Sequence, residues 1–438
     1  MVAVTASLVG ACSSGSTGGG SDGGDLSGQT ITVIDAQGHP QFNEVWDKIP
    51  EFTKETGIEV NLILNDTQTI RQKVLSALQL NQDTYDVVTL PNDTVSAAGP
   101  YLADLNGFLG DDSAFEKFQS QQPGWAQEKD LFEGKLRYLP FYAGGYGVAY
   151  RTDLLEDAAN QAAFEAEFGH AMQVPPESPE SLLELVQFFN DPPNRYGIVV
   201  PGQGETGRNV LEELIFRSGL TWQENDGTAG WGPGQTDAQE RVATAAAYLQ
   251  DLVWKHGAAP KELTGMATDG AAAFFNNCQA AMYMDLIYLS WSKIKESESK
   301  CGPVSSFRVP PFTSDAGEFI SFWMHSIPES SKHKEAAWKF LEWLHSEENL
   351  GLAVASPNGT FVPTDAMVAE KAVGEGVLPD AVVDAVGEGT AFLIDGNTSA
   401  IRLALDSPYD KLMANQISPA DFAASSGEAI AKIVEGSS

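Results

Sequence analysis

The sequence predicts a mixed α/β protein, and three observations lead to that fold class. The chain has 438 residues, which suffice for two or three domains at roughly 100–200 residues each. Apolar residues make up 42% and charged residues 20% of it, as in ordinary globular proteins, and no apolar run approaches the roughly 18 residues that a membrane span needs. Short β-type runs alternate with amphipathic segments, which is the pattern of a parallel sheet covered by helices.

The alternation is clearest at the start of the folded body. Phe42, Val45, Trp46 and Ile49 recur at helical spacing between two β-type runs, and Gly57 is a suitable end for that helix. The predicted elements are a strand, a helix, a strand, a helix and a strand, over 29–35, 42–57, 58–64, 69–80 and 85–90. Ligands of such sheets bind beyond the carboxyl ends of the strands, so the loops after these strands are candidate ligand-binding loops.

A second α/β region follows Pro140. It begins with a glycine-containing strand over 141–150, which suits a segment that passes between domains. The helices predicted next, and the strand after them, cover 182–189, 211–217, 241–255 and 279–285. A further strand over 322–327 precedes a helix whose apolar stripe consists of Ala337, Phe340, Leu341 and Leu344.

Four stretches carry a resemblance to a known family. They are residues 145–155, 280–288, 327–341 and 358–363, which read GYGVAYRTDLL, AAMYMDLIY, IPESSKHKEAAWKFL and NGTFVP. In this order they resemble segments of the extracellular solute-binding proteins of family 1, the sugar-binding, maltodextrin-binding-protein-like group that serves ABC importers. The chain departs from that family's usual residues at Arg151, which replaces Asn, at Leu286 and Ile287, which replace Gly and Pro, and at Tyr288, which replaces Trp.

The resemblance implies a two-lobed fold like that of periplasmic binding proteins, with a hinge and an interlobe cleft that closes on its ligand. Residues 28–140 plus 305–357 would form lobe 1, and residues 141–304 plus 358–438 would form lobe 2. The chain would be a binding protein rather than an enzyme, without a cofactor and monomeric. It would capture a carbohydrate, meaning a sugar, an oligosaccharide or a polyol, and deliver it to the permease and ATPase of an ABC importer.

The N-terminus resembles the end of a bacterial lipoprotein signal peptide. Val9, Gly10 and Ala11 precede Cys12, in the order that the lipoprotein cleavage motif has. By this resemblance residues 1–12 are the signal peptide with the lipidated Cys12, and the protein is extracytoplasmic and anchored to the cell membrane. No Lys or Arg precedes Cys12, although a secretory signal needs a basic segment, so we expect the true start to lie upstream of Met1.

Residues 13–27 are rich in glycine and serine and lack the apolar content to fold, so they are predicted to be a flexible tether. The folded body would then lie just outside a membrane. The alternative is a cytoplasmic protein with a polar tail.

The chain is strongly acidic. Its 60 acidic and 26 basic residues give a net charge of −34, and such a field repels phosphate backbones and anionic lipid headgroups. Nucleic-acid binding is therefore not expected, and contact with a membrane is expected only through the lipid anchor. The acidic residues are spread along the whole chain, which favours a solvated surface, while a cationic solute or a salty habitat are alternative reasons for the charge.

Cys278 and Cys301 are the two cysteines besides Cys12. In an exported protein this even remainder predicts one disulfide, and the alternative is a pair of buried free thiols. The sequence has no CxxC motif and no Cys/His cluster, so no metal site is expected.

Sugar sites combine flat aromatic faces with planar hydrogen-bonding groups. Side chains of these kinds on the loops after strands and on the hinge strand are the predicted ligand contacts: Gln37, His39, Asp66, Asn92, Asp93, Tyr142, Gln203, Glu205, Asp285, Tyr288 and Trp291. By the resemblance, Tyr288 is the stacking platform. Asp66 and Asn92 could instead cap the helices that follow them, His39 could be a plain turn residue, and Tyr142 could pack against the sheet.

Two other functions stay open at the level of the sequence. A secreted glycosidase needs two carboxylates that flank a sugar, and carboxylates are too abundant in this chain to decide the matter. A binding protein for a cationic solute fits the net charge, but no Cys/His/Glu cluster supports it. Residues 202–207 (GQGETG) resemble a phosphate-binding loop but lack the Lys-Ser/Thr that a nucleotide site needs.

Overall fold

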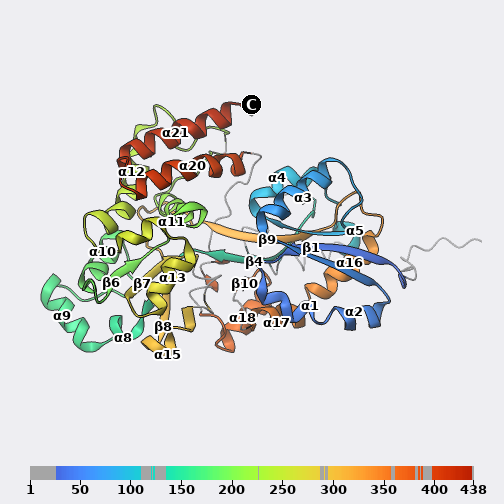
Figure 1. Ribbon diagram of the computed structural model, residues 1–438, viewed down its shortest axis with the longest axis horizontal. Coiled ribbons are helices and arrows are strands. Elements are labelled where there is room, and N and C mark those ends of the chain that lie inside the picture. Colours follow the sequence, from blue (N-terminus) through green and yellow to red (C-terminus); the bar gives the residue numbers. More distant parts are fainter. Residues whose placement is uncertain are drawn as a thin grey trace, which may run out of the picture.

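The computed structural model describes residues 26–109, 120, 122–123, 135–224, 226–286, 291, 294–356, 361–379, 383–384, 386–387 and 397–436. These residues form two α/β lobes that lie side by side, each around its own sheet (Figure 1). The expected α/β class with two lobes is thus confirmed. In the described part of the chain, no helix is both long and apolar enough to cross a bilayer.

The first lobe contains a six-stranded sheet of order β10-β4-β9-β3-β1-β2. Its strands are β1 (Thr30–Ala36), β2 (Glu59–Asn65), β3 (Val87–Pro91), β4 (Leu139–Gly145), β9 (Ile320–Ser326) and β10 (Val362–Pro363). Every residue of β3 is buried, as expected for a strand with neighbours on both sides and helices on both faces. Its helices include α1 (Asn43–Trp46), α2 (Ile49–Thr56), α3 (Thr67–Gln79), α4 (Val95–Ala98), α5 (Asn106–Leu109), α16 (Lys334–Leu344), α17 (Glu347–Val354) and α18 (Ala366–Gly374).

Two of the predicted helices of this lobe illustrate why the sequence folds locally as it does. Gly57 ends α2 in the left-handed region, with φ of +73°, which only glycine adopts at little cost. The predicted stripe Ala337, Phe340, Leu341 and Leu344 lies buried on α16.

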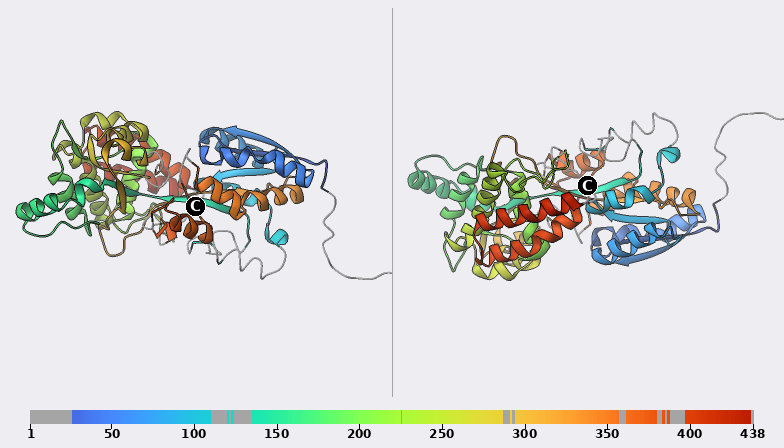
Figure 2. Two further views of the ribbon diagram at one scale, coloured as in Figure 1. Left: turned by 90° about the horizontal axis from the view of Figure 1, so that it is seen from below. Right: turned by 90° about the horizontal axis from the view of Figure 1, so that it is seen from above.

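The second lobe contains a four-stranded sheet of order β6-β7-β5-β8. Its strands are β5 (Gly147–Arg151), β6 (Tyr196–Val199), β7 (Ala280–Asp285) and β8 (Val304–Arg308). Its helices include α8 (Thr152–Leu155), α9 (Ala158–Phe168), α10 (Pro179–Phe188), α11 (Gly204–Phe216), α12 (Thr236–Trp254), α13 (Thr268–Asn276), α15 (Glu298–Cys301), α20 (Thr398–Met413) and α21 (Pro419–Gly436). The C-terminal helices α20 and α21, drawn in red, lie on this lobe in all views (Figures 1 and 2).

The sheets are not purely parallel, and the antiparallel strands are those that pass between the lobes. β1 runs parallel to β2 and β3, whereas β4 and β9 pair antiparallel with each other, and β5 pairs antiparallel with β7 and β8. A strand that enters its sheet from the other lobe comes from the opposite side, which reverses its direction. The predicted parallel pattern therefore holds only for β1, β2 and β3 and for β6 with β7.

The passages between the lobes lie at Tyr146, between β4 and β5, at residues 309–319, between β8 and β9, and between α18 and α20. The ranges predicted for the lobes assigned most of β4, and β10, to lobe 2. Both strands instead hydrogen-bond into the sheet of the first lobe. Conversely, most of β8 was assigned to lobe 1 but pairs with β5 in the second sheet. The differences arise because the chain changes lobes after β4, after β8 and after α18 rather than at the predicted boundaries.

Cys278 and Cys301 are joined by a disulfide, with their Cα atoms 5.4 Å apart. Cys278 precedes β7 and Cys301 ends α15, just before β8. The bond therefore ties together the starts of two strands of the second sheet.

Removal of this disulfide should destabilise the protein. For a loop closed over a sequence separation of 23 residues, the chain-entropy model gives about 3.5 kcal/mol. We expect the double variant Cys278→Ser, Cys301→Ser to lose an amount of this order in the free energy of unfolding, measured by urea titration. Thiol titration of the unreduced, unfolded protein without residues 1–27 should find no free thiol, and a count of two would contradict the pairing.

Candidate functional site

Polar side chains gather where the end of β3 in the first lobe meets α11 and α20 of the second lobe. On the first-lobe side, Asp93 follows β3 and is paired with Arg71 of α3, with Nη2 of Arg71 2.9 Å from Oδ2 of Asp93. Asn92, the neighbour of Asp93, is buried and donates from Nδ2 to the carbonyl oxygen of Ile320 at 3.2 Å. This bond fixes the end of β3 against β9.

On the second-lobe side, Arg402 of α20 is the central residue, and its side chain is 8% exposed. It donates from Nη2 to Oδ1 of Asn209 at 2.6 Å, and its guanidinium lies over the ring of Phe319, 5.5 Å from the centroid. Cation–π contacts of this kind favour a fixed guanidinium. The side chain is thus held in place by residues of its own lobe and of the passage between the lobes.

Ion pairs join the two sides. Nη1 of Arg402 lies 3.5 Å from Oδ2 of Asp93, and Nη2 of Arg402 lies 3.6 Å from Oε1 of Glu205. Nη2 of Arg71 lies 3.8 Å from the same Oε1 of Glu205. The hydroxyl of Ser399 also donates to the carbonyl oxygen of Asp93 at 2.9 Å. We call Arg71, Asp93, Glu205, Asn209, Glu212, Ser399 and Arg402 the interlobe cluster.

The helices α11 and α20 are held together behind this cluster. Arg208 of α11 is paired with Glu212 at 2.7 Å and with Asp406 of α20 at 2.5 Å. A Cβ at Gly207 would lie 2.5 Å from the hydroxyl of Tyr409, so only glycine allows the two helices to approach so closely. The cluster therefore rests on a rigid helix pair.

Two buried atoms of the cluster lack a hydrogen-bond partner in the described part of the chain. They are Oε2 of Glu212 and Nε of Arg402, which lie 3.7 Å from each other. One is an acceptor and the other a donor, and a buried polar atom left unpaired costs roughly 1–3 kcal/mol. A group that both accepts and donates a hydrogen bond would satisfy both atoms.

Tyr146 lies at the junction of β4 and β5, beside this cluster. It is 1% exposed, it is hydrogen-bonded with Asn209, and burial together with the charge of Asp285 raises its pKa well above the ordinary value. Asp285 ends β7 and accepts hydrogen bonds from the hydroxyl of Tyr283 and the backbone N–H of Leu286. Burial raises the pKa of Asp285 to about 6, so this carboxyl group is partly protonated near neutral pH.

A second polar network lies inside the first lobe. His39 is hydrogen-bonded to Asp35 at 3.0 Å and to the hydroxyl of Tyr142 at 2.7 Å. His325 lies 3.4 Å from the other carboxylate oxygen of Asp35 and 2.9 Å from Nε2 of His345. We call these five residues the histidine network. His39 and Tyr142 are both buried and contact the ring of Trp323. Tyr142 therefore packs against the sheet, and His39, for which a turn residue was the alternative, is a buried member of this network.

The pKa values in the histidine network are shifted by burial and by hydrogen bonds. Burial opposes the charge of Asp35, but the hydrogen bonds from His325 and His39 outweigh it and lower the pKa of that carboxyl. Burial lowers the pKa of His325, against the charge of Asp35. Burial and the neighbouring His325 lower the pKa of His345 well below its ordinary value. Asp35 is therefore ionised and His345 neutral at neutral pH.

The predicted ligand contacts thus fall into groups. Asp93 and Glu205 belong to the interlobe cluster. Asn92 is buried beside the cluster, and Asp285 is buried at the end of β7. Asp66 accepts from the backbone N–H of Thr69 at 2.9 Å, as a helix cap does, while Gln37 and Gln203 are exposed. Trp291 is buried at 3% exposure, and Tyr288 and Cys12 lie outside the described residues.

The sequence did not point to Arg71, Asn209, Ser399 or Arg402. In the sequence, opposite charges stand four residues apart at Arg208 and Glu212 and at Arg402 and Asp406, which is a recognisable helical signal. Nothing local indicates that α20 reaches the end of β3, because Ser399 and Asp93 are 306 residues apart. Among the described residues, no group of three His, Cys, Asp or Glu side chains is arranged to hold a metal ion.

Comparison with known proteins places this geometry in context. Residues 35–350 match the profile of a family described as bacterial extracellular solute-binding protein. The mannitol-binding protein of Pseudomonas aeruginosa is 22% identical over 311 residues, and the alignment covers 69% of this chain but only 65% of that protein. The erythritol/L-threitol-binding protein of Mycolicibacterium smegmatis is 23% identical over 353 residues, which cover 77% of this chain and 70% of that protein.

Solved structures show the same fold. The maltose-bound MalE3 of T. maritima has a TM-score of 0.72 at 20% identity, with 93% of this chain and 100% of that chain covered. A solute-binding protein of Agrobacterium radiobacter in complex with ribitol has a TM-score of 0.70 at 20% identity, with 94% and 99% covered. At this identity the likeness concerns the fold.

The histidine network makes stability depend on pH. A histidine whose folded pKa is lowered binds its proton more readily in the unfolded state, where the pKa is about 6.5, so its contribution is present above about pH 6.5 and is lost as the pH falls. We expect the free energy of unfolding of the parent to fall between pH 7.5 and 5.5 relative to that of His345→Gln, by up to about 1.4 kcal/mol per pH unit.

Urea titrations of both proteins at each pH measure this difference. Asp285 has a raised pKa and acts in the opposite direction, but it is present in both proteins and cancels in the comparison. His256→Gln serves as the control, because His256 is half-buried and lies just after α12, outside the histidine network. Parallel pH profiles of the parent and His345→Gln would contradict the assignment.

Proposed function

The chain belongs to the bacterial extracellular solute-binding protein family, and from this premise we propose that it captures a small polyhydroxylated solute between its two lobes. The family and the curated relatives are binding proteins, so this chain is a binding protein and not an enzyme. The proposed ligand is a polyol or a compact sugar. The interlobe cluster is its proposed binding site.

The observation that carries this proposal is the unpaired donor and acceptor of Arg402 and Glu212. A hydroxyl group donates one hydrogen bond and accepts others, so a single hydroxyl can satisfy both atoms. Glu205, whose side chain is 44% exposed at the edge of the cluster, offers a further acceptor. Polyhydroxylated ligands are the class that brings several such groups at once.

The surroundings favour an acyclic polyol or a compact sugar over a long oligosaccharide. Oligosaccharides are commonly held by open aromatic faces. The rings described beside the cluster, those of Tyr146 and Phe319, are buried, and Phe319 is covered by Arg402. The names of the relatives that bind mannitol, erythritol or L-threitol, and ribitol support the same ligand class.

A cationic solute is the weaker alternative. Each of the carboxylates Asp93, Glu205 and Glu212 lies within 4 Å of a guanidinium, so a cation would have to displace an existing ion pair. Such displacement leaves a buried guanidinium unpaired, which is costly. A neutral ligand can insert its hydroxyl groups without breaking these pairs.

The rest of the proposal concerns transport. Ligand contacts made by both lobes exist only when the lobes are closed, and the closed form would be the one that the permease and ATPase of an ABC importer recognise. The lipid on Cys12 and the tether over 13–27 would keep the protein at the outer face of the cell membrane. The interlobe cleft, the monomeric state and the roles of Tyr288 and Trp291 are parts of this proposal.

The ligand class is tested by a thermal-shift screen followed by calorimetry. Mannitol, ribitol, erythritol and maltotriose are compared, because a ligand that binds only the folded state raises the melting temperature. We expect Arg402→Ala to weaken the affinity for the tightest-binding ligand by roughly 10- to 150-fold, since a hydrogen bond to a charged group contributes about 1.5–3 kcal/mol.

Arg241→Ala is the matched control, because Arg241 forms an exposed ion pair with Asp315 outside the cluster. The Arg241→Ala variant should bind the same ligand with the affinity of the parent. If Arg402→Ala folds and binds as tightly as the parent, the interlobe cluster is not the site. If no polyol or sugar binds, the ligand class is wrong.

The anchor is tested in cells that express the protein from its own gene. The parent should partition with the membrane and into detergent, whereas Cys12→Ser should appear in the soluble or secreted fraction because the acyl chains are missing. A parent protein found in the cytoplasm would contradict the export and the anchor together.

A further inference from the structure

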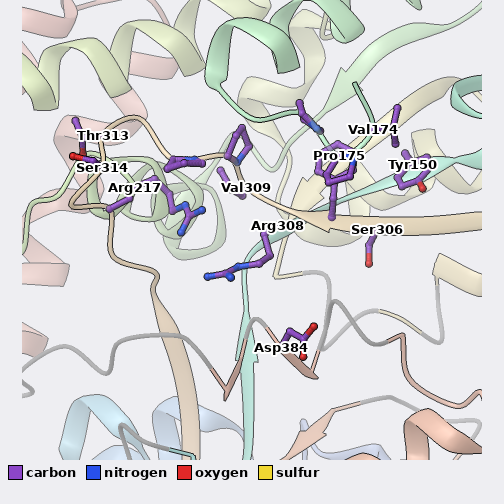
Figure 3. A pocket seen from close by; sticks show the side chains of 15 residues that line it. Tyr150, Val174, Pro175, Arg217, Ser306, Arg308, Val309, Thr313, Ser314 and Asp384 are labelled. Atoms are coloured by element: carbon purple, nitrogen blue, oxygen red, sulfur yellow. The ribbon is translucent and has the colours of Figure 1, made fainter. Parts of the chain in front are cut away.

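A pocket of about 590 Å³ lies at the passage from β8 to β9 and shares no residue with the interlobe cluster. Its walls come from Ser306–Arg308 of β8, from the passage residues 309–316, from the loop at Val174–Pro176 and from Asp384, which follows α18 (Figure 3). We call it the hinge pocket. Its position matters because β8 belongs to the second lobe, whereas α18 contacts α17 and β10 of the first.

Two arginines meet in this pocket. Figure 3 shows the side chains of Arg308 and Arg217 extending into the same region of the pocket wall. Both are oriented by the buried carboxylate of Glu318, which lies 2.5 Å from Nη2 of Arg308 and 4.0 Å from Nη1 of Arg217. Nη1 of Arg217 also donates to the carbonyl oxygen of Gly317 at 3.2 Å. The two guanidiniums are therefore held in fixed positions.

The buried polar atoms of the pocket lining that have no hydrogen-bond partner within the described ranges include two that can act as donors. They are Nε of Arg217, whose side chain is 8% exposed, and Oγ of Ser306, which is also 8% exposed as a residue. Glu213 lies 3.9 Å from that Nε, too far for a hydrogen bond, and burial and the charge of Glu318 raise the pKa of Glu213 well above the ordinary value. Both atoms can donate to an oxygen acceptor.

Part of the remaining wall is apolar, while Thr313, Ser314 and Asp384 add polar groups. The apolar part includes Val174, Pro175, Phe307 and Val309, and the ring of Tyr150 lies 5.4 Å from that of Phe307. Guanidinium groups bind carboxylates through two parallel hydrogen bonds, and proline and aromatic surfaces suit a planar apolar body. We propose that the hinge pocket binds a small organic anion, a carboxylate attached to a flat apolar body, and that its occupancy is coupled to the closure of the lobes.

The coupling follows from the place of the pocket. When the lobes rotate, the passage residues 309–316 and Asp384 move relative to β8, so the shape of the pocket changes with closure. A ligand that prefers one arrangement shifts the equilibrium toward it, and by linkage the ligand at the interlobe cluster changes the affinity of the pocket by the same factor. Only this coupling rests on the function proposed above, because binding to the pocket is independent of it.

Binding is tested with benzoate as the probe and benzyl alcohol as its neutral counterpart, by calorimetry on the full chain at pH 7.5. Benzoate should bind at a single site, and its affinity should fall as the salt concentration rises. Benzyl alcohol should bind at least about tenfold more weakly, because it cannot form the charge-assisted hydrogen bonds. Equal affinity for the two probes, or no binding of benzoate, would overturn the proposal.

Two substitutions with opposite expected effects locate the site. Arg308→Gln should weaken benzoate at least about tenfold. Asp384→Asn removes an exposed negative charge from the wall, so it should tighten benzoate about threefold at low salt, and it keeps the test decisive if Arg308→Gln does not fold. Lys432→Gln, which removes an exposed positive charge from α21 outside the pocket, is the control for a lost surface charge. Benzoate affinity that is the same in Asp384→Asn as in the parent would place the anion elsewhere.

The coupling is measured with the polyol or sugar that binds most tightly. Its affinity in saturating benzoate should differ from its affinity without benzoate by at least about fivefold, and the affinity of benzoate should change by the same factor when the polyol is saturating. Benzoate binding without any polyol binding would keep the pocket and reject the proposed function. Binding of both without mutual effect would reject the coupling.

Discussion

The antiparallel ladder between β4 and β9 is the interaction on which the arrangement of the two lobes depends. β4 continues through the single residue Tyr146 into β5, and β9 is reached from β8 through residues 309–319, so neighbouring strands in one sheet lead to neighbouring strands in the other. Two adjacent passages can bend about a common axis while each sheet keeps its hydrogen bonds. Pro140, which lacks an N–H, sits where the ladder is irregular between Pro140 and Tyr142, as proline in a central strand requires. The hinge is thus built into the strand order.

The strand order also determines which ion pairs can form between the lobes. The pairs between Asp93 and Arg402 and between Arg71 and Glu205 join the lobes, so these contacts exist only when the lobes are close together. The desolvation penalty of burying such charges offsets much of their mutual attraction. When the lobes open, the charged groups are hydrated again. The open and closed forms are therefore expected to differ little in free energy, which is the condition under which a ligand can decide between them. The histidine network, by contrast, lies within one lobe, and closure does not change its partners.

Local patterns in the sequence predicted the elements, and long-range contacts decided the site. The stripe of α16, the end of α2 at Gly57 and the strands around Val33 and Val88 follow from periodicity, because each depends on neighbouring residues only. The direction of β5 and β9 depends on which lobe the chain has come from, and no local pattern records that. Asp93 and Glu205 of the interlobe cluster are among the predicted ligand contacts, because they lie on polar loops after strands. No local pattern indicates Arg402, because its partners lie after β3 and in α11, far away in sequence. Nor does a local pattern record that His39 is buried against Trp323 and Tyr142.

The polarity of the interlobe cluster also decides between ligand classes, whatever the size of the ligand. A carboxylate placed between Nε of Arg402 and Oε2 of Glu212 would gain a hydrogen bond from the arginine and face the negative charge of the glutamate, and an ammonium group would meet the reverse. In both cases one favourable contact is offset by one unfavourable contact in a buried site, where charges interact strongly. A hydroxyl is neutral and pairs with both atoms. The same two atoms therefore attract a hydroxyl and repel part of any ion, whatever its sign. For this reason a strongly charged cluster can be selective for a neutral ligand.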